Sequence, residues 1–189
     1  MRKYILLLFI LSSLLLNAKH LEFMGIPING SIALFSTKLK SKGYTQLQGN
    51  NQLPIGIRGF HGVFAGEECE LYVYYNPKTK IVYQCRVFIN CNYSIETAES
   101  KFDYFKELLN KKYGDVALTS DMMTDVESDE TEYTLMIIEP PIEVGAKLIG
   151  GIVVKIYEPG VFSDSYELGI SYEDIVNSAK NEQDNLDDL

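Results

Sequence analysis

The 189-residue sequence contains no tryptophan, two histidines and three cysteines. Without indole rings, a sugar-stacking platform is disfavoured, although 13 tyrosines could replace them. Two histidines, with His20 close to the N-terminal segment, supply too few ligands for the usual zinc sites. The sequence also has no Gly-x-Ser-x-Gly elbow, and no Ser-x-x-Lys in the setting that a serine nucleophile needs. We therefore assign no catalytic residue and no cofactor.

Positive charge is also scarce. There are 17 Lys and Arg against 26 Asp and Glu, which gives a net charge of −9. The balance becomes −11 once Arg2 and Lys3 are removed, because every acidic residue lies after them. Such a chain would approach nucleic-acid phosphates against its own field, and it has no basic stripe. A nucleic-acid partner is not expected.

The only long apolar run is at the N-terminus. Arg2 and Lys3 precede an apolar run from Tyr4 to Leu16, and the small residue Ala18 follows. The run is shorter than the roughly 20 residues that span a bilayer, and the pattern is typical of a secretory signal peptide. We predict a signal peptide at 1–18 and a mature chain that is periplasmic or secreted, without a membrane span.

Residues 25–32, GIPINGSI, resemble a phosphate-binding loop but lack its lysine. Pro27 also removes one N–H donor. The pattern instead favours a turn and cap that begin a helix at Ser31.

Hydrophobic spacing divides the chain into alternating helical and strand-like blocks. Period 3.6 predicts a helix over 31–42 that ends at Gly43, and a second helix that begins with a cap at Ser94. Their predicted core positions are Ile32, partly Leu34, Phe35 and Leu39 in the first, and Ile95, Ala98, Phe102, Phe105 and Leu109 in the second. Period 2 predicts strands in 45–92 and again after the second helix, beginning with VALTS at 116–120. The pattern predicts an α+β fold of order α-β-β-β-α-β-β-β(-β). We place a first helix-plus-strands half at 19–92, a second at 93–176, and an acidic polar tail, either a short helix or disordered, at 177–189. The two halves are either an internal duplication or two unrelated amphipathic helices with similar caps.

Alternation also predicts which side chains face the core. One face carries Cys69, Leu71, Val73 and Tyr75 on one strand, and Ile81, Tyr83, Cys85, Val87 and Ile89 on the next. If the hairpin between these strands keeps both faces in register, Cys69 lies opposite Cys85. We predict a disulfide between them, with free buried thiols as the alternative.

An acidic stretch covers 121–132. Asp125, Glu127 and Asp129 have the spacing of calcium-loop positions one, three and five, but Glu130 stands where the glycine belongs. A solvated acidic loop is favoured, and a loose calcium site is the alternative.

Several short motifs together resemble a known group of proteins. They are GIPING, KSKGY, GVFAG, ELYVYY, SYEDIVN and LDDL. The chain resembles small exported proteins of the Bacteroides type, which implies an envelope or secreted setting and an α+β fold but no catalytic residue. The order of elements is also similar to the tandem architecture of β-lactamase inhibitor proteins, as an analogy of fold alone.

Tyr72 and Tyr74 alternate away from the core positions of their strand, so they are the candidate binding residues. The sequence favours a non-catalytic module that binds a protein or ligand, with a protein partner in the envelope or outside the cell. The alternative is an envelope hydrolase with paired carboxylates, for which Glu139, Glu143 and Asp164 are candidates. A structural or assembly factor is a third class that the sequence does not separate from the first.

Overall fold

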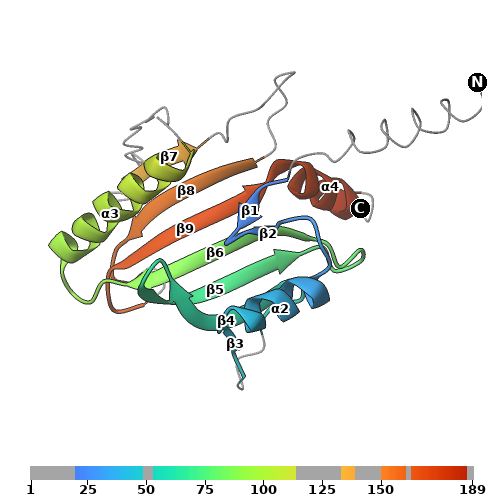
Figure 1. The fold of residues 1–189 in the computed structure, drawn as a ribbon, viewed down its shortest axis with the longest axis horizontal. Helices are drawn as coiled ribbons and strands as arrows, with labels where there is room; N and C mark the ends of the chain where they lie inside the picture. The colour runs from blue at the N-terminus through green and yellow to red at the C-terminus, as the bar shows by residue number, and fades with distance from the viewer. Residues whose placement is uncertain (1–19, 49–52, 114–132, 139–149, 161–162, 187–189) are drawn as a thin grey trace, which may run out of the picture.

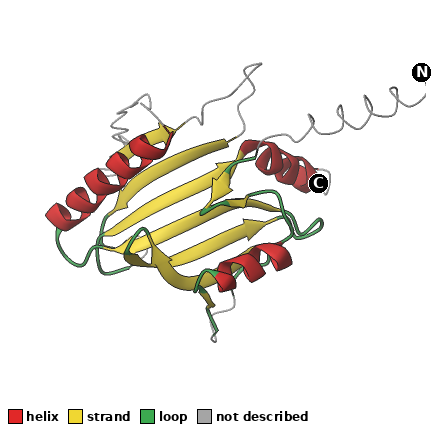
Figure 2. Ribbon diagram, viewed as in Figure 1, coloured by secondary structure: helices red, strands yellow, loops and turns green. Residues whose placement is uncertain are grey.

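The computed structural model describes residues 20–48, 53–113, 133–138, 150–160 and 163–186. A large antiparallel sheet forms one layer, and two helices with a small hairpin cover one of its faces (Figures 1 and 2). The elements in chain order are β1 (Glu22–Phe23), β2 (Ile26–Pro27), α2 (Ile32–Ser41), β3 (Thr45–Gln46), β4 (Ile57–Phe64), β5 (Glu67–Tyr75), β6 (Val82–Asn90), α3 (Ile95–Tyr113), β7 (Tyr133–Ile138), β8 (Gly150–Tyr157), β9 (Glu167–Asp174) and α4 (Ile175–Leu186). The α+β class is confirmed. The predicted strand VALTS and the acidic stretch 121–132 lie outside the described residues.

The sheet has seven strands in the order β3-β4-β5-β6-β9-β8-β7, and all neighbours are antiparallel. Four strands, β3 to β6, follow α2, and the described strands after α3 are β7 to β9. The last strands of the two sets, β6 and β9, pair along their length at the centre of the sheet. Such an order is compatible with a duplicated unit, and duplication stays a hypothesis.

The helix ends follow the predicted capping signals. The Ser31 hydroxyl accepts a hydrogen bond from the Leu34 N–H at 3.3 Å, and Gly43 follows the helix at φ +91°. At the second helix, the Ser94 hydroxyl accepts from the Thr97 N–H at 3.2 Å. Both caps satisfy N–H groups that the first helical turn leaves without partners.

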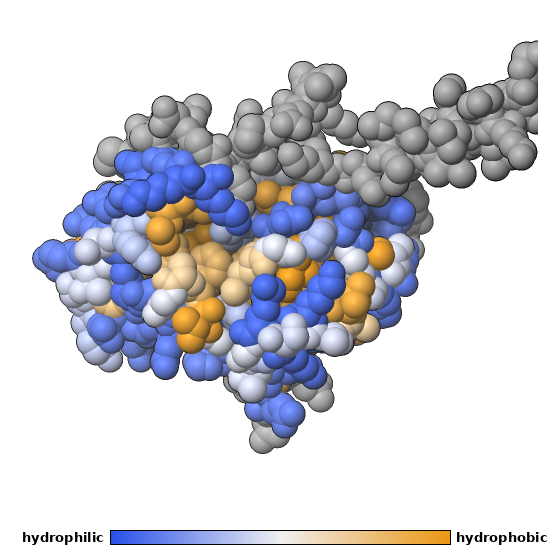
Figure 3. All heavy atoms as spheres, in the orientation of Figure 1, coloured by the Kyte–Doolittle hydropathy of each residue, from blue (hydrophilic) through white to orange (hydrophobic). Residues whose placement is uncertain are grey.

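The core lies between the sheet and its helices. In α2 the predicted core positions Ile32, Phe35 and Leu39 are buried, but Leu34 is 52% exposed. In α3 the buried positions are Ala98, Phe102, Phe105 and Leu109, and Ile95 is partly buried. Figure 3 shows this side of the molecule, with apolar residues gathered between α3 and the β1–β2 hairpin.

Aromatic rings from four elements meet in this core. The Phe64 ring stacks on Phe23 of β1 at 5.4 Å and on Phe105 of α3 at 5.7 Å. Tyr172 of β9 contacts Phe23 edge-on at 5.3 Å. This cluster joins side chains from both predicted halves.

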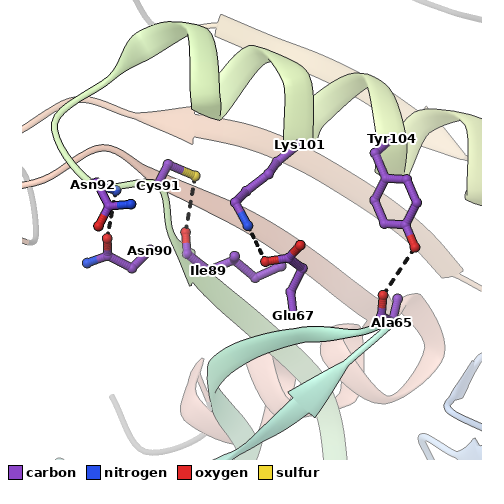
Figure 4. Close-up of polar contacts among 8 residues, drawn as sticks. All are labelled: Ala65, Glu67, Ile89, Asn90, Cys91, Asn92, Lys101 and Tyr104. Atoms are coloured by element: carbon purple, nitrogen blue, oxygen red, sulfur yellow. Dashed lines mark hydrogen bonds and ion pairs between the residues drawn. The ribbon is translucent and has the colours of Figure 1, made fainter.

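Polar contacts attach α3 to the turn between β4 and β5 (Figure 4). Lys101 forms an ion pair with Glu67, and the Tyr104 hydroxyl donates to the Ala65 carbonyl at 3.2 Å. The first half of the chain therefore positions the helix of the second half.

The predicted disulfide between Cys69 and Cys85 is wrong. The register places Val73 opposite Cys85, so Cys69 lies four residues away along β5, about 13 Å at the usual rise per residue. All three cysteines are free and buried.

A wide turn explains this error in register. The Asn76 side chain accepts hydrogen bonds from the Lys78 and Thr79 N–H groups, and Lys80 has a φ of 62°. The loop therefore extends over 76–81 and moves β6 along β5.

The prediction that Tyr83 faces the core is also wrong. A β-bulge interrupts the pairing at Tyr74 and Tyr75, so Val82 takes the fully buried position. Tyr83 then lies beside Tyr74, with ring centroids 6.4 Å apart.

The C-terminal stretch is anchored to one end of the sheet. Asp174 is fully buried, accepts from the Asn177 N–H at 3.0 Å and pairs with His20 at 2.8 Å. Its carboxylate therefore caps α4 and holds the N-terminal segment. The sequence predicted either a short helix or a disordered tail at 177–189. In its described residues the structure has the helix, which begins two residues earlier, at Ile175.

Candidate binding site on the open sheet face

The candidate binding residues Tyr72 and Tyr74 lie on one face of the sheet, and Leu71 and Val73 lie on the other. Leu71 and Val73 are fully buried, whereas Tyr72 and Tyr74 between them are half-buried and point to the other side. We call this side the open face, because α2, α3 and the β1–β2 hairpin pack on the opposite one (Figure 1). The structure thus places both predicted tyrosines on the open face.

Aromatic side chains form a row across several strands of the open face. The Tyr72 ring meets Phe88 of β6 edge-on at 5.8 Å, and Phe88 lies 5.7 Å from Tyr157 of β8. Gly169 of β9 makes room for this row, since a Cβ there would lie 2.5 Å from a Tyr157 ring carbon. Contacts of this kind hold the rings in fixed positions.

Two cations lie among these rings. The Arg86 guanidinium is 5.1 Å from the Tyr74 ring centre, and the Lys155 ammonium is 5.9 Å from that of Tyr157. Burial, and then the charge of Arg86, lower the pKa of Lys155. The rings of the open face therefore already contact cations of the chain itself.

A groove of about 470 Å³ is open beside the tyrosines. Its walls come from β4, β5, β6 and β9 and from the segment that precedes β4. The lining residues are Leu53, Pro54, Ile57, Glu70, Tyr72, Tyr74, Phe88 and Glu167. The size is in the usual range of ligand sites.

Two carboxyl groups belong to the groove. The Tyr72 hydroxyl donates a hydrogen bond to Glu70 at 2.6 Å, and burial followed by this bond raises the pKa of Tyr72. Burial raises the pKa of Glu167, the Ser163 hydrogen bond opposes the change, and the charge of Glu70 adds to it. Negative charge thus gathers beside aromatic rings, at an exposed Glu70 and a partly buried Glu167.

Sequence reasoning found the two tyrosines and missed Glu70, Phe88 and Glu167. Alternation along β5 places Glu70 on the same face as Tyr72, so that signal was present. Glu167 joins them because β9 pairs with β6, a long-range contact with no local signal.

Of the predicted carboxylate site residues, only Asp164 lies in the described part of the chain, and it does not line the groove. Asp164 is exposed in a loop, and Glu139 and Glu143 lie outside the described residues. Asp125, Glu127 and Asp129 lie there too, so the calcium alternative stays a prediction. In the part of the chain that the structure describes, no group of three or more His, Cys, Asp or Glu could hold a metal ion.

Within the described ranges, no helix is long and apolar enough to cross a membrane. No family model, curated protein or solved structure matches the chain. Any functional argument therefore rests on the geometry of the open face.

Proposed function

We propose that this protein is an exported, non-catalytic binding module that holds a protein partner on its open sheet face. The observation that carries the proposal is the row of fixed aromatic rings beside a groove of about 470 Å³. Tyrosine and arginine are the residues that most often dominate binding energy in protein interfaces.

The two faces of the sheet differ in their burial, and this difference supports the proposed role. One face contributes the buried core, so its residues are needed for folding. Tyr72, Tyr74 and Arg86 lie on the other face and are only partly buried. A partner could cover them without disturbing the core.

The setting belongs to the proposal as well. A signal peptide at 1–18 would deliver the mature chain to the periplasm or the outside of the cell. Its partner is then expected among envelope or extracellular proteins.

Capture of partners from an envelope extract tests the proposal. A variant with Tyr72→Ala and Tyr74→Ala is expected to capture at least tenfold less partner than the wild type, because interface aromatics often contribute about 2 kcal/mol each to binding. Tyr93→Ala is the matched control, since Tyr93 is 80% exposed in the loop before α3.

Thermal unfolding accompanies this comparison. The double variant should unfold close to the wild-type temperature if the tyrosines form a contact surface. Collapse of its stability, or equal capture by a folded double variant, would contradict the proposal.

One observation favours a second candidate, an envelope hydrolase with paired carboxylates. Glu70 and Glu167 line the same groove, and a raised pKa is what a general acid needs. Release of product from chromogenic glycosides or esters, lost in both Glu70→Gln and Glu167→Gln, would establish that activity.

A further inference from the structure

Charge divides the open face into two parts. Of the eight described residues that line the groove, two are acidic and none is basic. Arg86 and Lys155, two cations of this face, line a separate hollow of only about 20 Å³. The acidic part therefore has room for a ligand group, and the basic part has not.

In the part of the chain that the structure describes, neither carboxylate of the groove is paired with a cation. Among the described residues, the ion pairs join His20 to Asp174, Lys101 to Glu67 and Lys111 to Glu107, so neither Glu70 nor Glu167 takes part in one. Glu70 instead accepts a hydrogen bond from the neutral Tyr72 hydroxyl. A cation placed between the carboxylates would relieve their repulsion.

The other walls of the groove suit a cation on a carbon chain. Tyr72, Tyr74 and Phe88 offer ring faces or edges, and Leu53, Pro54 and Ile57 offer apolar surface. Arginine and lysine side chains combine an aliphatic stem with a charged end, so they can contact both kinds of wall.

We infer that the groove binds an arginine or lysine side chain of the partner polypeptide, with its charged end at Glu70 and Glu167 and its stem along Tyr72 and Phe88. This inference rests on the proposed function. The groove, at about 470 Å³, exceeds the volume of one such side chain, so the neighbouring residues of the partner also enter it.

Short peptides test the charge requirement directly. The probes are acetyl-Gly-Arg-Gly-amide, its neutral citrulline analogue and acetyl-Gly-Glu-Gly-amide, each titrated into the isotope-labelled protein and followed by amide chemical shifts. We expect the arginine peptide to shift the signals of Tyr72, Phe88 and Glu167, and the citrulline peptide to bind at least tenfold more weakly.

Variants of the protein give the reciprocal test. Glu70→Gln combined with Glu167→Gln should weaken arginine-peptide binding at least tenfold, whereas Glu99→Gln, on an exposed position of α3, should leave it unchanged. The citrulline comparison uses the wild-type protein, so it tests the requirement for a positive charge even if the double variant folds poorly.

Three results would overturn the inference: equal binding of the arginine and citrulline peptides, shifts produced only by the glutamate peptide, or no shift with any probe. The proposed function is judged separately, by partner capture with the tyrosine variants. Capture that depends on Tyr72 and Tyr74 without any preference for the arginine peptide would remove the cation claim alone.

Discussion

Glu167 lies where burial and the charge of Glu70 both disfavour its ionised form. Its raised pKa means that the folded protein holds this proton more tightly than the unfolded chain does. The associated stability is present below the ordinary pKa of 4.5 and is lost as pH rises through the folded-state pKa. At neutral pH the ionised carboxylate therefore costs stability, as groups at binding sites often do.

The Glu167→Gln variant should consequently melt at a slightly higher temperature than the wild type at pH 7. Glutamine imitates the protonated side chain, so the difference should vanish near pH 4, where wild-type Glu167 is itself protonated. Thermal unfolding at both pH values, with Glu99→Gln as control, measures this effect. A variant less stable than the wild type at pH 7 would show that the ionised carboxylate is favourable.

At the scale of elements, hydrophobic periodicity predicted the core-facing side of a helix or strand wherever one face of that element is buried. The helical spacing of Phe102, Phe105 and Leu109 predicted the core side of α3, because a helix that packs on a sheet buries one stripe. The turn between β5 and β6 was harder to predict. The Asn76 side-chain hydrogen bonds widen the turn, a β-bulge interrupts the pairing at Tyr74 and Tyr75 beside it, and both changed the register.

This register leads to a prediction about the thiols. With Val73 opposite Cys85 and Cys69 farther along β5, no disulfide should form even in an oxidising compartment. A thiol titration of the purified protein under denaturing, non-reducing conditions should count three free thiols. A count of one would contradict the prediction, since it would mean that two of the three cysteines form a disulfide.

At the scale of the molecule, the sheet and the aromatic cluster join the two halves. β6 and β9 pair from Asn90 to Gln84, and Phe64 of the first half stacks on Phe105 of the second. The described buried residues of both halves form one hydrophobic cluster. We expect the described residues to unfold as one cooperative unit.

Replacement of Phe105 by alanine tests this coupling. Loss of this buried phenylalanine should lower the free energy of unfolding by about 3–5 kcal/mol. The unfolding transition should remain single, because the cavity left by the ring would be lined by side chains of both halves. Denaturant unfolding followed by circular dichroism and tyrosine fluorescence gives both quantities. Tyr93→Ala, at an exposed position, should cost within about 0.5 kcal/mol. Two separate transitions would show that the halves are independent.

Local rules carried most of the information about the elements. Ser31 and Ser94 as caps, Gly43 as a helix stop and the alternation of Tyr72 with Leu71 all depend on neighbours within a few residues, so the sequence alone was sufficient to predict them. The groove required more. Glu70 meets Phe88 because β5 pairs with β6, and Glu167 joins them because β9 lies against β6. Strand order and register depend on the packing of the whole core, and the tertiary structure alone brings these groups into one site.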